Sequence, residues 1–319
     1  MKKRYLILIL ILIVLSLTSL FLGAKNITLS EILKGDIDSI RIFLISRLPR
    51  LISILIAGVV MSVCGLIMQQ ISQNKFVSPT TGATIDSAQL GIMVAIIIFP
   101  SASIMQKTII SFIFALIGTF IFIIFLRNLK IKNIVFVPLV GIIFGNIIGS
   151  VTTFLGYKFD LLQSVSSWLQ GNFSMILKGN YELLYLSIPL VIITIVYANM
   201  FTVVGMGKDF ATNLGLNYDK IVNIGVTIVA LATVIVVVTA GSIPFIGLIV
   251  PNLVAMYKGD NVNKSLLDIA LVGSIFILVC DVIGRVIIYP YELPIGVTVG
   301  VIGSVVFLCI VLRRNGRGK

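Results

Sequence analysis

Residues 46–70 read SRLPRLISILIAGVVMSVCGLIMQQ. Arg47 and Arg50 flank Pro49 at its start, and the nineteen residues from Leu51 to Gln69 carry no charge. About 20 apolar residues in a helix are enough to cross the hydrocarbon core of a bilayer, and a proline suits an early helical position. The stretch therefore predicts a membrane-spanning helix with two cations at its entrance.

The composition of the chain is that of a membrane protein. Of its 319 residues, 58% are hydrophobic and 11% are charged, whereas soluble domains carry about 25% charged residues. The net charge of +12 does not indicate nucleic-acid binding, because Lys and Arg beside apolar runs orient membrane spans. We therefore predict an all-α integral membrane protein that forms a single transmembrane domain over residues 1–319.

Ten apolar runs predict about ten transmembrane helices. They cover residues 5–24, 48–70, 84–100, 107–126, 134–155, 182–203, 221–240, 243–257, 266–289 and 294–312. The first run is long for a signal peptide and lacks a clear cleavage site, so we interpret it as a retained span. Ten spans place both termini on one side. That side holds the larger share of the 24 Lys and Arg residues, which predicts that it is the cytoplasmic side of the cell membrane.

Two segments break the apolar pattern with Gly and Pro. They read NKFVSPTTGATIDS (residues 74–87) and SIPFIGLIVPN (residues 242–252). Irregular backbone at membrane depth is tolerated only where protein or a water-filled cavity covers it. We expect broken or short helices in both segments, and their similar form is consistent with the inverted repeats of transporters.

Several kinds of chemistry are excluded by residues that the chain lacks. It has no histidine, which excludes histidine-ligated haem and histidine-based zinc or iron catalysis within this chain. Cys64, Cys280 and Cys309 lie in apolar runs without CxxC spacing, so neither a disulfide framework nor a zinc site is indicated. The pattern Gly-x4-Gly-Lys-Ser/Thr is also absent, so the chain does not bind ATP through a P-loop. We predict no catalytic, metal or cofactor site.

Polar and charged residues inside the apolar runs are few. Asp281 lies four residues before Arg285, so the two share a helix face and are expected to form a structural ion pair. Asp86 follows the first broken segment and either lines a polar pathway or caps a helix. The polar run QQISQN at 69–74 lines an inner vestibule or caps a helix at the interface. The loop at about 204–220 predicts a short amphipathic helix and a second turn, which either docks a partner or lies as an ordinary interfacial helix.

Five motifs occur in one order along the chain. They are RLPR (residues 47–50), GKDFATNLGL (207–216), GSIPFIGLIVP (241–251), Asp281 with Arg285 four residues later, and ELPIGVTVGVIGSVVF (292–307). This set resembles the permease subunits of ABC importers for iron–siderophore complexes and vitamin B12, over nearly the whole chain. Two positions depart from the family pattern, because Asn252 replaces a histidine and Lys75 stands where a proline is common. NKFVSP followed by TTG is similar to permeases for catecholate-type siderophores such as petrobactin.

The resemblance implies a type II ABC importer permease fold with ten helices, paired with a second copy or with a related permease. Two cytoplasmic ATPase subunits, which hold ATP and Mg, and an external substrate-binding lipoprotein complete such an importer, and the expected cargo is a ferric siderophore. The chain itself then performs no covalent chemistry and needs no cofactor. Vitamin B12 or haem as cargo stays open, as does a proton-coupled secondary transporter that uses Asp86 and Asp281.

Three groups of site residues follow from the resemblance. Sockets for carboxylates of the binding protein are assigned to Arg47, Arg50 and Arg285, since arginine grips a carboxylate with two bonds; anchoring in lipid headgroups is the alternative. The coupling helix that docks the ATPase is assigned to Lys208, Asp209, Ala211, Thr212, Leu214, Gly215 and Leu216. The path or gate is expected at Ser78, Thr80, Thr81, Thr84, Gly141, Gly145 and Asn146. For its glycines, plain helix packing is the alternative.

Overall fold

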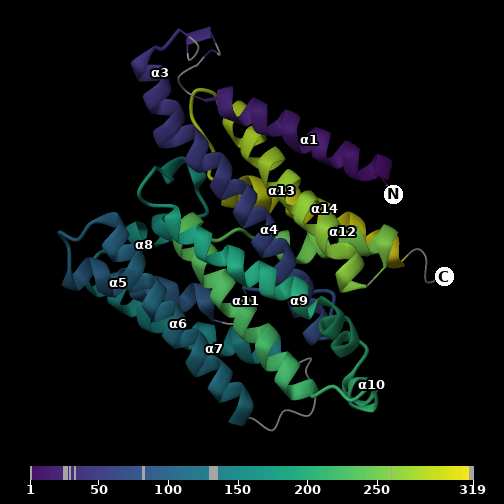
Figure 1. The fold of residues 1–319 in the computed structure, drawn as a ribbon. Coiled ribbons are helices and arrows are strands. Elements are labelled where there is room, and N and C mark those ends of the chain that lie inside the picture. The colour runs from purple at the N-terminus through teal and green to yellow at the C-terminus, as the bar shows by residue number, and fades with distance from the viewer. Residues whose placement is uncertain are drawn as a thin grey trace.

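The computed structural model describes residues 2–23, 28, 30–31, 34–80, 83–128, 136–259 and 261–315 as a bundle of helices (Figure 1). Its long helices are α1 (Lys2–Phe21), α4 (Leu48–Ile71), α5 (Thr84–Ile98), α6 (Ile104–Asn128), α7 (Phe136–Lys158), α9 (Ser187–Gly205), α11 (Tyr218–Ala240), α12 (Ile246–Lys258), α13 (Val262–Val286) and α14 (Ile295–Asn315). Its short helices are α3 (Ile37–Ile42), α8 (Leu162–Leu169) and α10 (Lys208–Asn213). A π-helical turn covers Phe43–Arg47, and 3-10 turns cover Phe173–Met175 and Glu182–Leu186.

Within the described residues, seven helical segments are long and apolar enough to cross a membrane. They are Lys3–Phe21, Ile37–Ile71, Ile104–Phe122, Leu139–Lys158, Glu182–Gly205, Tyr218–Ala240 and Val262–Val286. Shorter apolar helices lie at Thr84–Ile98, Ile246–Lys258 and Ile295–Ile310. The prediction of an all-α membrane fold is confirmed, whereas the count of ten crossings stays a prediction.

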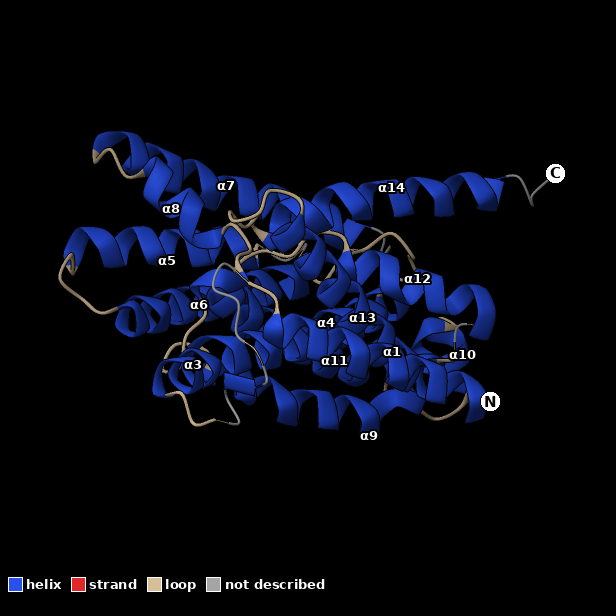
Figure 2. Cartoon of the chain, turned by 90° about the horizontal axis from the view of Figure 1, so that it is seen from above, coloured by secondary structure: helices blue, strands red, loops and turns tan. Residues whose placement is uncertain are grey.

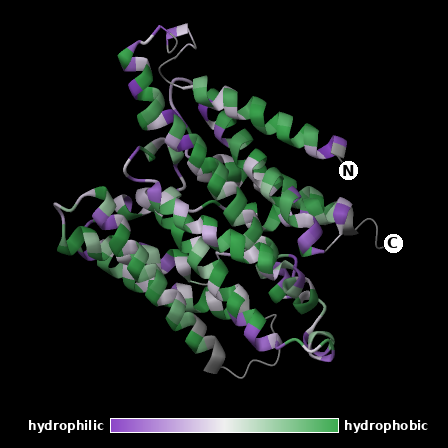
Figure 3. Ribbon diagram, viewed as in Figure 1, coloured by the Kyte–Doolittle hydropathy of each residue, from purple (hydrophilic) through white to green (hydrophobic). Residues whose placement is uncertain are grey.

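The two ends of the bundle carry different elements. The start of α1, the end of α14 and α10 lie at one end, whereas α3 and α8 lie at the other (Figures 1 and 2). Hydrophobic residues cover most of the helix surfaces between these ends (Figure 3). The bundle therefore has two separate end surfaces, with apolar helix surfaces between them.

α4 is the central helix. It packs against α9, α11, α12 and α13 and crosses the middle of the molecule in Figure 1. In the most apolar window of the span that contains it, 78% of the residues are buried, against 6% for the span in α1, because four helices surround α4. Glycines permit its closest crossings. A Cβ on Gly58 would lie 2.6 Å from Cα of Ser274, and one on Gly65 would lie 1.9 Å from the carbonyl oxygen of Gly247.

The entrance of α4 differs from the sequence prediction. We expected a helix to begin near residue 48, but the helical segment runs from α3 through the π-helical turn at Phe43–Arg47 into α4. Pro49 has no N–H to donate to the carbonyl of Ile45. The backbone N–H of Lys178 donates to that carbonyl at 2.9 Å instead. A donor from a distant loop therefore satisfies the group that the proline leaves free.

The two broken segments lead into short helices that contact each other. α5 has 15 residues and α12 has 13, fewer than the about 20 that a full crossing needs. Each begins after a non-glycine residue with positive φ, Ala83 at 59° and Phe245 at 63°, a conformation that surrounding contacts have to hold. A Cβ on Gly247 would lie 2.4 Å from Cδ of Pro79. The first segment therefore packs directly against the first turn of α12.

The beginning of α1 is held on the bundle by one buried carboxylate. Asp268 of α13 is fully buried and accepts hydrogen bonds from Arg4 Nη2 at 2.6 Å and from Tyr5 Oη at 3.0 Å. Lys258, at the end of α12, also pairs with Asp268 and donates to Tyr5 Oη at 2.7 Å. Two cations and a phenol therefore neutralise a carboxylate that would be costly to bury alone.

The crossing of α4 with α12 is expected to limit the stability of the fold. Gly65→Ala places a methyl group where the backbone of Gly247 lies, and such overpacking costs about 1–3 kcal/mol. The matched control is Gly300→Ala, where the new Cβ meets only Cγ of Pro244 at 3.9 Å. We expect Gly65→Ala to lower the melting temperature in detergent by several degrees and Gly300→Ala to leave it unchanged or raised. Equal melting temperatures for the two variants would contradict this description of the crossing.

Candidate functional site

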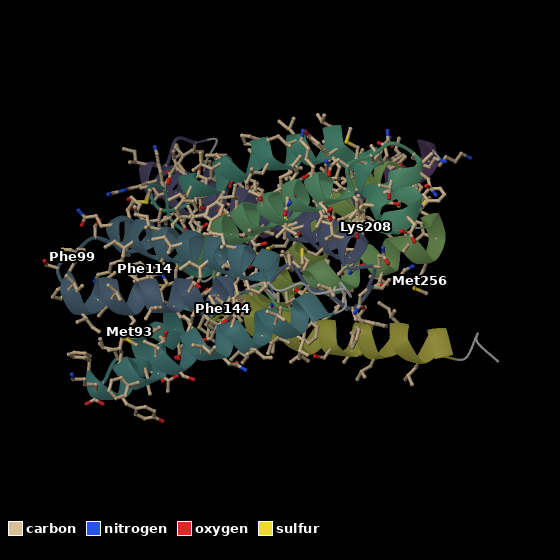
Figure 4. All side chains as sticks on the ribbon, turned by 90° about the horizontal axis from the view of Figure 1, so that it is seen from below. Met93, Phe99, Phe114, Phe144, Lys208 and Met256 are labelled. Carbon is tan, nitrogen blue, oxygen red and sulfur yellow. The ribbon has the colours of Figure 1, made fainter. Side chains whose placement is uncertain are left out.

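An open polar groove of about 660 Å³ runs along α5 and α7. It is lined by Asp86, Gln89, Asn146, Gly149, Ser150, Thr153, Phe154 and Tyr157. The four polar residues of α7 recur at spacings of four, three and four, so they form one stripe along three turns. Phe144 of α7, labelled in Figure 4, does not belong to this stripe. It packs against α6, where the centre of its ring lies 5.8 Å from that of Phe122 and 6.1 Å from that of Phe125. Amides and hydroxyls on a spanning helix need protein or water beside them, because lipid offers them no hydrogen bonds.

Two of the predicted path residues belong to this groove. Asn146 lines it, and Gly145 lies behind it, where a Cβ would be 2.4 Å from Oδ2 of Asp86. Thr81 lies outside the described residues. The sequence analysis missed several lining residues, although their helical spacing in the run after Asn146 was the available signal. They are Ser150, Thr153 and Tyr157. Gln89 of α5 was missed as well, and it lies three residues after Asp86.

The other predicted path residues have different surroundings. Ser78 and Thr80 are half-buried and share a hydrogen bond of 3.0 Å between their hydroxyls. Thr84 is 1% exposed, and its hydroxyl lies 3.2 Å from that of Thr119 in α6. Gly141 is buried in α7. The structure therefore gathers the polar face of α7 with Asp86 and not with Thr84, and the role of each residue in a path stays a prediction.

Asp86 lies deep along α5. It occupies the first turn of that helix, twelve residues before Ile98, which corresponds to about 18 Å along the axis. Phe99, just beyond, is 51% exposed and marks the edge of the molecule in Figure 4. A carboxylate at such depth in an apolar bundle is by default a candidate for function.

The three arginines predicted as docking sockets lie in one cluster with two carboxylates. Arg50 is 6% exposed and binds Asp281 Oδ1 through Nη2 at 2.8 Å. Its Nη1 binds Oε2 of Glu292 at 2.6 Å. Arg285, 2% exposed, forms the predicted ion pair with Asp281, which is confirmed. The charges of Arg50 and Arg285 are therefore paired within the chain.

The cluster also holds the end of α1. Arg285 donates to the carbonyl oxygens of Ser19 at 2.8 Å and Leu22 at 3.0 Å. Arg47, 8% exposed, donates to the same Leu22 oxygen at 2.7 Å. Cations near helix-end carbonyls are favoured by the helix dipole. Because these guanidinium groups already have partners, a binding protein has to compete for them, and the docking role stays a prediction.

α10 forms a rigid knob at the end of the bundle that holds the start of α1 and the end of α14. It begins after Gly207, which has φ 110°. It closes in a Schellman motif, in which the N–H of Gly215 donates to the oxygen of Thr212 at 2.9 Å and that of Leu216 to the oxygen of Ala211 at 3.0 Å. Gly215 has φ 78°, a conformation that favours glycine.

The exposed ridge of the α10 knob is apolar. Phe210 and Leu214 are 48% and 59% exposed and lie four residues apart, so they share one face of α10. Met206, which is 59% exposed, precedes the helix. Of the predicted coupling residues, Lys208, Asp209, Thr212, Leu214 and Gly215 are exposed, Ala211 is buried and Leu216 is half-buried. Phe210 lies within the motif at 207–216 but was not among the assigned coupling residues, although its spacing of four residues from Leu214 could have indicated it.

A second pocket, of about 430 Å³, lies near the knob between α4, α9, α12 and α13. Its lining includes the glutamines at 69, 70 and 73. Nearby, Asn252 Nδ2 donates to the carbonyl oxygens of Lys75 and Leu248, both at 2.7 Å. The two positions that depart from the family pattern therefore contact each other.

The comparisons with known proteins identify the family of the chain. The model of the FecCD transport family matches residues 9–313. The chain belongs to this family. The predicted resemblance to permeases of iron–siderophore ABC importers is thereby confirmed.

Its relatives include two petrobactin permeases. The chain is 53% identical to the petrobactin import system permease protein YclN of Bacillus subtilis (strain 168), over 99% of both chains. It is 39% identical to the petrobactin import system permease protein FatD of Bacillus anthracis, over 98% of this chain and 92% of that one. A solved metal-chelate type ABC transporter in an inward-facing conformation has the same fold, with a TM-score of 0.84 at 22% identity over 98% of this chain and 100% of that one.

The buried carboxylate of the arginine cluster is expected to be essential for folding. Asp281→Asn leaves Arg50 and Arg285 without their shared counter-charge, and breaking a buried pair costs about 3–5 kcal/mol. Asp219→Asn is the matched control, because Asp219 pairs with Lys208 at 3.2 Å in an exposed position, where a pair contributes about 0–1 kcal/mol. Thermal unfolding in detergent should separate the two variants clearly. The assignment is wrong if Asp281→Asn melts at the temperature of Asp219→Asn.

Proposed function

We propose that the chain is the transmembrane permease subunit of an ABC importer that moves a ferric siderophore into the cell across the cytoplasmic membrane. The observation that carries the proposal is the polar groove along α5 and α7 in a bundle that is otherwise apolar. Membership of the family supports the class of transporter. The names of the relatives, which are permeases for petrobactin and for ferric anguibactin, support the cargo.

The groove requires a second wall. Its polar stripe is exposed in the single chain and would otherwise face lipid, so a second copy or a related permease closes the path. The family's architecture adds two ATPase subunits that hold ATP and Mg, and an external substrate-binding lipoprotein. The chain has no P-loop and performs no covalent chemistry itself. With the ten crossings that the sequence predicts, both termini and the α10 knob would lie in the cytoplasm and the arginine cluster at the outer face.

The knob supplies the mechanical link in this proposal. Its apolar ridge fits a cleft of an ATPase, and its Schellman closure keeps it stiff. α10 packs against α9 and α11, and α11 packs in turn against α5 and α6. Movement of the ATPase therefore reaches the wall of the groove through α11, and the groove opens alternately to the two sides.

A proton-coupled transporter is disfavoured by the surroundings of Asp281. This carboxylate is 4% exposed and paired with two arginines, so it is poorly placed to release and accept protons. Vitamin B12 and haem are disfavoured as cargo by the names of the relatives. An uptake assay separates these functions.

The first test uses the chain, its ATPase and its binding protein together in proteoliposomes. Uptake of ⁵⁵Fe-petrobactin should require ATP and should persist in the presence of a protonophore. Replacement of the ridge by Phe210→Ala with Leu214→Ala should lower uptake by at least about tenfold, since each buried apolar side chain contributes about 1.5–3 kcal/mol to docking. Ile192→Ala with Val196→Ala, on the exposed face of α9, should leave uptake unchanged. Uptake that a protonophore abolishes would overturn the ABC mechanism.

A second test concerns Glu292, which holds Arg50 in the free permease. Glu292→Gln removes the charge that competes with a carboxylate of the binding protein, so association should become several-fold faster at low salt. Asp38→Asn, an exposed residue at the same end, removes one negative charge without touching Arg50 and should change association little. Binding kinetics measured by surface plasmon resonance on detergent-solubilised permease would show the difference. Slower association for Glu292→Gln would exclude the competition.

A further inference from the structure

We propose that Asp86 is the cargo-binding carboxylate of the groove and that the imported chelate carries a protonated amine, which Asp86 binds during passage. This inference rests on the proposed function and specifies the chemical class of its cargo. It concerns the single charged side chain among the described lining residues of the groove.

The carboxylate of Asp86 sits in a space that α7 leaves free for it. A Cβ on Gly145 would lie 2.4 Å from Oδ2, and one on Gly149 would lie 3.5 Å from Oδ1. These two glycines are four residues apart and therefore lie on one face of α7. The first turn of α5 also favours a negative charge, through its free backbone N–H groups. The two glycines therefore leave room for the carboxylate at the groove, and the helix dipole favours its charge.

Asp86 differs from the other carboxylates in the bundle. Asp268 pairs with two cations, one from α1 and one from α12. Asp281 also pairs with two cations, Arg50 and Arg285. For Asp86 no cation lies within ion-pair distance among the described residues. In a chain with a net charge of +12, a groove whose charge is negative selects a positive partner from outside the chain.

The neutral residues of the groove suit an ammonium group. Gln89 and Asn146 offer amide oxygens, and Ser150, Thr153 and Tyr157 offer hydroxyl oxygens. An ammonium has three donors and no acceptor, so it can bind the carboxylate and two of these oxygens together. A purely anionic chelate would instead meet repulsion at this point from both permeases of a homodimer. The groove therefore favours a chelate with a positively charged amine over an anionic one with the same iron ligands.

The test compares two ⁵⁵Fe chelates in proteoliposomes that contain the permease, its ATPase and its binding protein. One chelate carries a primary amine, and the other is its N-acetylated form with the same iron ligands. Each chelate is supplied at a concentration that saturates the binding protein, so a difference in affinity for that protein does not affect the compared rates. The variants are Asp86→Asn, which keeps shape and loses charge, and Asp86→Glu, which keeps charge.

We expect the wild-type importer to move the amine form about tenfold faster than the acetylated form. Asp86→Asn should slow the amine form to the rate of the acetylated form and leave the latter unchanged, whereas Asp86→Glu should retain most of the preference. Equal slowing of both chelates, or no change in either, would overturn the proposal, as would loss of the permease dimer in Asp86→Asn on size-exclusion chromatography. Failure of the wild type to import either chelate would instead reject the proposed function.

Discussion

Charge buried in an apolar bundle has to meet opposite charge, and α13 meets this requirement twice. Its two carboxylates, Asp268 and Asp281, lie thirteen residues apart. The first pairs with cations of α1 and α12, and the second with cations of α4 and of α13 itself. Since Arg285 also binds carbonyl oxygens at the end of α1, α1 is tied to α13 near both of its ends. A helix whose span is only 6% buried is thereby fixed by polar contacts, which lipid cannot replace.

The same requirement explains the contacts of the broken segments. Where a helix stops within the bundle, its backbone groups need donors and acceptors from elsewhere. Asn252 supplies one by donating to the carbonyl of Lys75 at 2.7 Å, which joins α12 to the loop before α5. The sequence pattern on which the resemblance rests has a histidine and a proline at these two positions. In this chain the side-chain amide of Asn252 and the backbone carbonyl of Lys75 form the contact between the two segments. The two residues that depart from the pattern therefore interact directly with each other.

The sequence predicted much of the fold because composition and length decide which segments enter a membrane. The run 84–100 corresponds to α5, and 243–257 corresponds to the short α12. It could not predict which faces meet, because helices that are apolar on every side carry no stripe that marks the packed face. The bond from Lys178 to Ile45 and the pairing of Arg50 with Glu292 join positions distant in sequence, and no local pattern encodes them. The ion pair of Asp281 and Arg285 was predictable, since both lie on one helix face. The groove was only partly predictable, because glycine and small polar residues occur both where helices pack closely and where a transport path is lined.

The distribution of satisfied and unsatisfied charge divides the bundle into two parts. α1, α4, α12 and α13 hold the paired carboxylates and the closest glycine crossings, such as Gly65 on Gly247, and such close packing resists small displacements. α5 and α7 hold the open groove and a carboxylate for which the described residues supply no counter-ion. α11 contacts both parts, because it packs against α4 and against α5 and α6, and its first turn follows directly after the α10 knob. A force applied at the knob therefore moves α11 relative to the closely packed helices α1, α4, α12 and α13. The helices that can be displaced are α5 and α7, which line the groove. On the proposed function, this arrangement lets an ATPase at one end of the bundle change the width of the path without breaking any of the buried ion pairs.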